Sequence, residues 1–111
     1  MEQRLLENIA RITSLAVRQV EATVSLLDNG STIPFISRYR KEVTGNLDEV
    51  QIQSIETAYE QVKELEKRRK FILESIGSQG KLTDDLRSRI LNSDSITLED
   101  LYLPYKQNLF V

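Results

Sequence analysis

Hydrophobic residues recur at steps of three or four along nearly the whole chain, which is the period of an amphipathic α-helix. In the first thirty residues this pattern predicts two helices joined around Thr13-Ser14-Leu15. The second runs from Val17 to Asp28 and stops at Asn29-Gly30. Their lengths suit a helix-turn-helix-like pair. We find no alternation of apolar and polar residues typical of β-strands, so the sequence predicts an all-α fold, an irregular helical bundle.

The stretch "IPFISRYRKE", residues 33–42, predicts a short third helix. Pro34 suits the first turn of a helix, where a missing N–H needs no partner, and Thr44-Gly45 ends the segment. Phe35 and Tyr39 share a face at i, i+4 spacing, together with Ile36. We therefore expect Phe35 and Tyr39 to be packing anchors that hold this helix in the core.

A long helix is predicted to follow. Asn46 and Glu49 have the spacing of a capping box, and an apolar stripe then runs from Ile52 to Ile76, before glycines at 77 and 80. Thirty helical residues extend about 45 Å. Because a compact domain of this size needs less, we expect the far end of this spine helix to project or to meet something outside the chain.

Two shorter helices complete the pattern. Thr83-Asp84-Asp85 is a predicted cap for the first, and Thr97 with Asp100 repeats the capping spacing before the second. Pro104 ends the last turn. Leu101 and Tyr102 are the expected packing anchors of this final helix.

The chain has 111 residues, which is one domain's worth, and we expect a single core. It contains no Cys and no His, which excludes thiolate nucleophiles, sulfur-ligated metals and serine–histidine chemistry. The carboxylate pairs Asp84-Asp85 and Glu99-Asp100 occupy first turns of predicted helices, where capping explains them. We therefore predict no catalytic residue, no metal site and no cofactor.

The N-terminus, "MEQRLLENIARI", lacks the apolar run of a secretory signal, and no stretch approaches eighteen consecutive apolar residues. These features predict a cytoplasmic protein that does not contact membranes. The net charge is −2, so attraction to nucleic acid has to come from a local cluster of cations.

Two stretches carry a specific resemblance: "STIPFISRYRKEVTGNLDE" (31–49) and "LEDLYLPYK" (98–106). With "VRQVEATVSLLDNG" (17–30) and "LEKRRKFILESIGSQGKLTDDL" (65–86), they resemble, in order, the N-terminal region of the bacterial Tex family of transcription accessory proteins. The resemblance covers a helical domain of residues 1–106. We expect residues 107–111 to be a divergent or truncated tail, because family members usually continue with a basic run.

This resemblance implies a cytoplasmic protein that binds nucleic acid and acts in transcription or RNA metabolism. Full-length Tex proteins continue into a ribonuclease-H-like domain, a helix-hairpin-helix domain and an OB-fold RNA-binding domain. None of these fits within 111 residues, so the chain corresponds to the helical N-terminal part.

The first cluster of cations comprises Arg38, Arg40 and Lys41. These side chains either contact phosphates or pair with the acidic residues at 42, 48 and 49, and we favour the pairing. For Arg38 we favour a structural role in bracing a junction between helices.

The second cluster is Lys67-Arg68-Arg69-Lys70 on the long helix. Arg69 interrupts the apolar stripe, so either the helix has left the core here or this side chain snorkels past it. The four cations can track a phosphate backbone, but intrahelical pairs with nearby glutamates are the favoured interpretation.

The leading hypothesis is a non-catalytic helical module that scaffolds a nucleic-acid-binding, Tex-like transcription accessory protein. Its partners are the downstream domains of that protein, and as an isolated fragment it can form a homodimer through an exposed apolar strip. The competing hypothesis is an autonomous DNA- or RNA-binding, helix-turn-helix-like domain. A recognition helix at residues 17–28 offers Arg18 and Gln19 as base contacts, which is a sparse supply.

Overall fold

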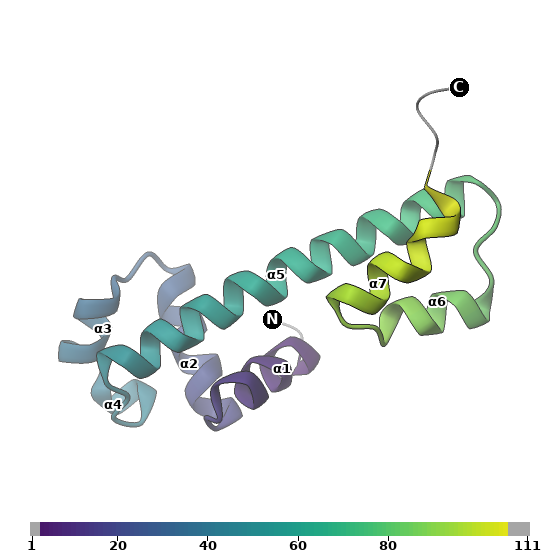
Figure 1. Cartoon of the computed structure of the whole chain (residues 1–111). Coiled ribbons are helices and arrows are strands. Elements are labelled where there is room, and N and C mark those ends of the chain that lie inside the picture. Colours follow the sequence, from purple (N-terminus) through teal and green to yellow (C-terminus); the bar gives the residue numbers. More distant parts are fainter. Residues whose placement is uncertain (1–2, 107–111) are drawn as a thin grey trace. The chain divides into compact units, whose positions relative to one another are not determined.

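The computed structural model describes residues 3–106, and every regular element in that range is a helix (Figure 1). This confirms the all-α prediction. The divergent tail, residues 107–111, lies outside the described residues. The elements are α1 (Gln3–Thr13), α2 (Val17–Asp28), α3 (Ile33–Tyr39), α4 (Lys41–Thr44), α5 (Glu49–Ser78), α6 (Asp84–Leu91), α7 (Ser95–Tyr102) and the 3₁₀ turn η1 (Leu103–Tyr105).

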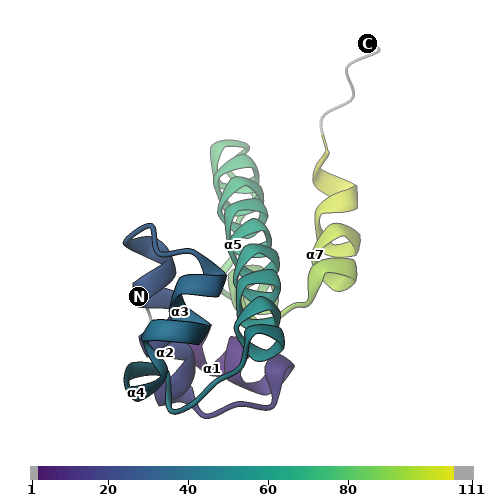
Figure 2. The same cartoon turned by 90° about the vertical axis from the view of Figure 1, so that its left-hand side faces the viewer.

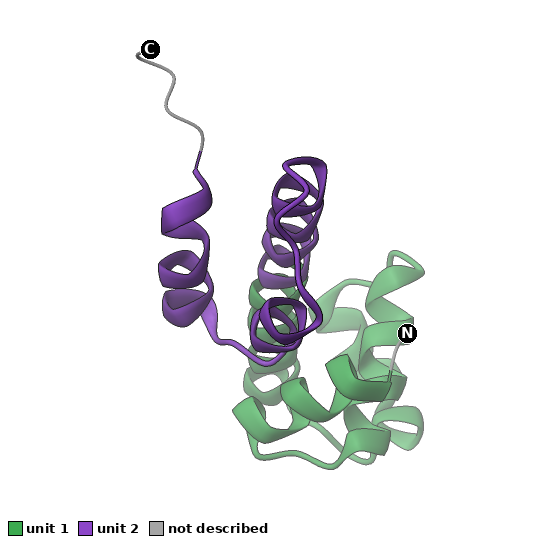
Figure 3. Ribbon diagram, turned by 90° about the vertical axis from the view of Figure 1, so that its right-hand side faces the viewer, with its two compact units in different colours: residues 1–63 green, residues 64–111 purple. Residues whose placement is uncertain are grey.

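The chain divides into two compact units, residues 1–63 and 64–111 (Figure 3). Each unit has its own cluster of buried side chains, so the expectation of a single core is wrong. The thirty-residue helix α5, predicted from its apolar stripe, supplies both clusters. Its first half buries Ile52 and Ile55 in the first unit, and its second half buries Ile72 and Ile76 in the second.

In the first unit, α1 and α2 are joined by a tight turn at the predicted position. Ser14 has a positive φ of 59°, and the N–H of Leu15 donates to the carbonyl of Ala10 over 3.1 Å. This bond satisfies one of the carbonyls left free at a helix end. Helix α2 then packs against α1, α3 and α4 (Figure 2).

The predicted third helix is two helices. Arg40, with φ −127° and ψ 29°, leaves the helical conformation, so α3 ends at Tyr39 and α4 begins at Lys41. The carbonyl of Arg40 accepts from the N–H groups of Val43 and Thr44, both over 3.1 Å, and these bonds start the new turn.

Helix α5 begins with a capping box, at a position two residues after the predicted one. The N–H of Gln51 donates to the carboxylate of Asp48 over 2.7 Å, and the Gln51 side chain accepts from the Asp48 N–H over 2.9 Å. Asn46 cannot be the cap, because its φ is 67° and a capping residue needs extended backbone.

The second unit contains the remaining helices. Thr83 caps α6 as predicted, since its hydroxyl accepts from the N–H of Leu86 over 3.1 Å. The cap of α7 is Asp94, whose carboxylate accepts from the N–H of Thr97 over 2.7 Å. Thr97 therefore lies inside the first turn instead of preceding it. Pro104 lies in η1, directly after α7.

Candidate functional site

Two surfaces, one on each unit, collect part of the residues that the sequence singled out. The first, the α3–α4 surface, comprises Phe35, Arg38, Tyr39, Arg40, Lys41 and Val43. The second, the α5–α7 groove, is lined by Arg68, Phe71, Glu74, Ser75, Ser78, Tyr102 and Lys106.

On the α3–α4 surface, the expected packing anchors are exposed. Ile36 is fully buried, whereas 38% of Phe35 and 57% of Tyr39 remain accessible. Helical geometry places Phe35 and Tyr39 about 60 to 100° around the axis from Ile36, so one side of α3 packs inward and the aromatic side does not. The two rings contact each other instead, with centroids 5.4 Å apart. Phe35 and Tyr39 are therefore not core anchors.

One cation of this surface, Arg40, lies beside those rings. The guanidinium of Arg40 sits over the ring of Phe35, 5.1 Å from its centroid, and donates to the carbonyl of Tyr39 over 3.3 Å. Arg38 and Lys41 are exposed. Among residues 3–106, none of the three forms an ion pair, so the favoured pairing with the acidic residues at 42, 48 and 49 is absent.

A hollow of about 470 Å³ lies beside α4. Gln19 lines this hollow together with Ala16 and Gly45. Its side-chain oxygen accepts from the N–H of Ala16 over 3.2 Å, and its amide donates to the carbonyl of Gly45 over 3.2 Å. Gln19 thus fastens α2 to the end of α4 and is engaged internally, whereas Arg18 is exposed at the edge of the hollow.

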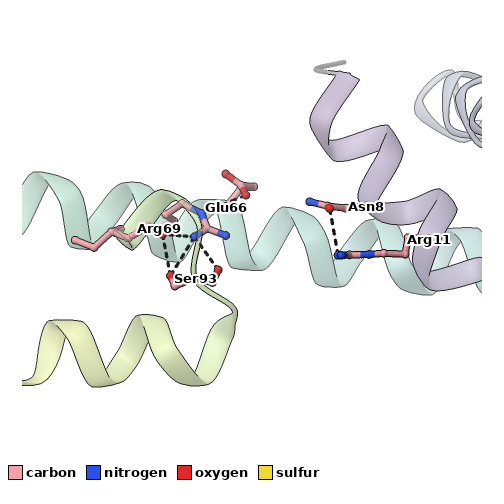
Figure 4. A network of polar contacts seen from close by, with 6 residues as sticks. Asn8, Arg11, Glu66, Arg69 and Ser93 are labelled. Atoms are coloured by element: carbon pink, nitrogen blue, oxygen red, sulfur yellow. Dashed lines mark hydrogen bonds and ion pairs between the residues drawn. The ribbon is translucent and has the colours of Figure 1, made fainter. Parts of the chain in front are cut away.

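In the second unit, Arg69 is a buried structural residue, only 4% exposed. Its guanidinium donates to the carbonyl of Ile90 and, over 3.0 Å, to that of Ser93, and it pairs with Glu66 over 3.3 Å (Figure 4). The first two bonds satisfy a carbonyl in the last turn of α6 and one in the loop that follows it. This position does not favour the predicted contact with nucleic acid, because the side chain is enclosed and its Nε and Nη1 groups donate within the unit.

The helix does not leave the core at Arg69, and the side chain does not snorkel past it, since the guanidinium finds partners inside the second unit. Its pair with Glu66 confirms the favoured intrahelical pairing at this residue. The sequence signal for this structural role was the position of Arg69 on the apolar, buried stripe of the long helix. A buried arginine requires several acceptors, and helix ends supply them.

Arg68 is also engaged. It forms two hydrogen bonds with the carboxylate of Glu99, over 2.8 and 2.9 Å, and its guanidinium lies over the rings of Phe71 and Tyr102 at 5.1 and 5.4 Å. The bonds from Arg68 lower the pKa of Glu99 below its ordinary value. Lys67 and Lys70 of the basic run are exposed, whereas Arg68 is half-buried and engaged by Glu99.

The α5–α7 groove is built around Tyr102 and has a volume of about 630 Å³. The Tyr102 hydroxyl hydrogen-bonds that of Ser75 over 3.1 Å, and its ring meets Phe71 edge-on at 6.2 Å. Lys106 lies over the same ring at 5.9 Å. Tyr102 is buried in the second core, and Leu101 packs partly buried against it.

The groove brings together Arg68 and Tyr102, which the sequence indicated in separate segments. It also contains Phe71, Ser75 and Lys106, which the sequence did not indicate as site residues. The motif "LEDLYLPYK" was the available signal, because it holds Glu99, Tyr102 and Lys106 together.

Within residues 3–106, no group of three acidic, histidine or cysteine side chains is arranged to hold a metal ion. In the same range, no helix has both the length and the apolar character needed to cross a bilayer.

Comparison with known proteins identifies the region. Residues 3–77 match the family model described as the Tex-like protein N-terminal domain. The chain is 60% identical over 89 residues to Protein YhgF of Escherichia coli, covering 79% of this chain and 12% of that protein. It is 50% identical over 104 residues to the transcriptional accessory protein Tex of Neisseria gonorrhoeae, covering 89% and 14%.

A more distant relative is the human S1 RNA-binding domain-containing protein 1, 32% identical over 84 residues, which are 75% of this chain and 8% of that protein. The chain thus spans at most 14% of the length of these relatives. The family match covers more than half of the chain, which therefore belongs to the Tex-like proteins and corresponds to their N-terminal domain.

Proposed function

We propose that this chain is a non-catalytic, cytoplasmic scaffolding module of a transcription accessory protein that binds nucleic acid through other domains. The observation that carries the proposal is the number of large apolar side chains left accessible. Within residues 3–106 there are eight: Ile12, Phe35, Tyr39, Val43, Val50, Phe71, Ile96 and Leu103.

Single exposed apolar residues are common on folded proteins, but grouped ones mark contact surfaces. Phe35 and Tyr39 touch each other on the first unit, and Phe71 lies in the α5–α7 groove on the second. Covering such side chains gains about 25 cal/mol per Å² of apolar area. Both units therefore offer surface to further domains, as expected for a region that spans 12 to 14% of its bacterial relatives.

The acidic pairs support the non-catalytic part of the proposal. Asp85 pairs with Arg89 over 3.2 Å, and Glu99 is held by Arg68. A general acid or base needs a carboxyl group that can reach a substrate proton. One carboxylate of each pair, Asp85 or Glu99, is instead bonded to a guanidinium group.

Complementation in trans tests the scaffolding role. The part of the Escherichia coli relative that follows the matched segment would be purified and mixed with this chain, and complex formation would be followed by calorimetry and light scattering. We expect a one-to-one complex that Phe71→Ala or Tyr39→Ala weakens. Absence of a complex, or the chain pairing with itself in preference, contradicts the scaffolding role.

The competing hypothesis of an autonomous DNA- or RNA-binding domain has support from the unpaired cations Arg38, Arg40 and Lys41 and from the exposed Lys67 and Lys70. Its prediction is binding to a nucleic acid that weakens steeply with salt and with alanine at residues 38, 40 and 41. A salt titration with labelled single-stranded and duplex oligonucleotides checks this. No binding at low salt eliminates the hypothesis.

A further inference from the structure

We propose that the α3–α4 surface is a docking site for an acidic protein segment that carries apolar side chains. This goes beyond the scaffolding role, because it assigns a partner chemistry to one surface of the first unit. Apolar area, positive charge and local rigidity on this surface lead to the proposal.

The apolar part consists of side chains close together in sequence. Phe35, Tyr39 and Val43 are 38%, 57% and 46% exposed. The two rings are in contact with each other, and Val43 lines the hollow beside α4. A partner can therefore lay one apolar side chain on the rings and place another in the hollow.

The charge of this surface is opposite to that of the whole chain. Arg38, Arg40 and Lys41 lie on or between the two helices, and Arg18 lines the hollow, whereas Glu42 is the acidic residue that lines it. The chain as a whole carries a net charge of −2. A locally positive surface on an acidic molecule favours a negatively charged partner and increases its association rate.

The rings favour a protein segment over a nucleic acid. Bases stack on free aromatic faces, but one face of Phe35 is covered by the guanidinium of Arg40, and its ring also meets Tyr39. Val43 has no ring on which a base could stack. A short segment with one or two carboxylates and aliphatic or aromatic side chains uses both the cations and Val43.

The surface is also held in place before binding. Thr32 caps α3, Ile36 is fully buried beneath it, and Gln19 fastens the end of α4 to α2. Ordering costs reduce affinity, so a preformed surface on short, capped helices is suited to capturing a flexible peptide.

Selection from a random peptide library tests the proposal without choosing a sequence in advance. Phage displaying random 16-residue peptides would be panned on the whole chain, with removal of phage that bind a Tyr39→Ala/Arg38→Glu double variant. We expect the recovered peptides to be acidic and to contain Leu, Phe or Trp. Both substituted side chains are exposed, and circular dichroism would verify that the double variant keeps its helices.

Fluorescence anisotropy of a recovered peptide then measures each contribution. Tyr39→Ala or Arg38→Glu should weaken binding by about tenfold. The matched controls Ile96→Ala and Lys67→Glu, which change exposed residues of the second unit, should leave binding within twofold. Amide shifts on binding should concentrate in residues 33–45.

Three results overturn the docking site. One is the absence of any peptide enriched over the double variant, and another is enrichment of neutral or basic peptides. The third is displacement of the bound peptide by a ten-nucleotide oligouridine of higher affinity, which makes the surface a nucleic-acid site. The complementation test of the scaffolding role uses no selected peptide. The scaffolding proposal and the docking-site proposal can therefore fail independently of each other.

Discussion

The guanidinium of Arg69 donates to the main-chain carbonyl of Ser93 across 3.0 Å and across 24 residues of sequence. It also donates to the carbonyl of Ile90 at the end of α6. The last carbonyls of a helix have no partner within it, and here a side chain from α5 supplies the donors. Arg69 therefore joins three segments of the second unit, and we expect it to contribute to the stability of that unit.

Replacing Arg69 with Met should destabilise the second unit by about 3 kcal/mol, because the Ser93 carbonyl loses its donor and Glu66 loses its ion pair, although the Ile90 carbonyl still accepts from Ser93. Arg69→Lys keeps the charge but loses the planar fork, so we expect an intermediate loss. Hydrogen exchange of the amides in residues 84–102 measures the loss of stability in both variants. Lys67→Met, an exposed change on the same helix, is the control, and equal effects at the two positions contradict the structural role.

The ion pair of Arg68 and Glu99 should make stability depend on pH. The pKa of Glu99 is lowered in the folded protein, so its contribution is fully present above its ordinary pKa, about 4.3, and disappears as pH falls through the lower, folded-state value. Both side chains are about 40% exposed, which limits the contribution to less than about 1 kcal/mol.

Urea unfolding of Glu99→Gln and of the unchanged chain checks this prediction. The difference between them should be largest near pH 7 and should shrink below about pH 4. Glu74→Gln, which alters an exposed residue of the same groove, should show a smaller effect at neutral pH. A Glu99→Gln difference that grows on acidification contradicts the assigned sign.

Thr23 and Thr44 form a matched pair, since both are fully buried. The Thr44 hydroxyl accepts from the N–H of Leu47 over 3.3 Å, whereas that of Thr23 has no hydrogen-bond partner among the described residues. Thr44→Val should cost about 1 kcal/mol of unfolding free energy, and Thr23→Val should be neutral or stabilising. Urea unfolding of the two variants measures the difference, and the reverse order shows that the hydroxyl of Thr23 is paired.

Gly45 and Gly30 both have positive φ, of 74° and 88°, but differ in their surroundings. A Cβ at Gly45 comes within 3.0 Å of the Gln19 side-chain amide, whereas at Gly30 it meets nothing within 4 Å. Gly30→Ala should cost about 1 kcal/mol from backbone strain, and Gly45→Ala more.

The double change Gln19→Ala/Gly45→Ala separates the two causes at Gly45, because it removes the crowding and keeps the strain. We expect it to be less destabilised than the sum of the two single changes, as measured by thermal unfolding. Strict additivity indicates that the Gln19 side chain moves aside without cost.

Several helix boundaries followed from local chemistry and were predicted accurately. The second helix spans Val17–Asp28 as expected, and Thr83 caps α6. The predicted helix starts were wrong where two neighbouring residues could both cap the helix. Asp48 caps α5 instead of Asn46, and Asp94 caps α7 instead of Thr97, because a cap depends on the backbone angles of one residue as well as on its type.

Only part of each candidate surface could be predicted from the sequence. It indicated Arg38, Arg40 and Lys41 as a cluster; in the structure none of the three forms an ion pair within residues 3–106, and Arg40 lies over the ring of Phe35. It did not separate the buried Arg69 from the exposed Lys67, because four consecutive residues of a helix face all directions.

By itself, the sequence determined the all-α class, the long helix and the order of the shorter helices, since apolar period and turn residues act over a few positions. Tertiary structure alone decided that the core divides in two, that Phe35 and Tyr39 stay at the surface, and that Arg69 reaches Ser93. The period of a helix shows which residues share a face. Which face is covered, and which distant carbonyl meets a buried cation, depends on how separate helices pack.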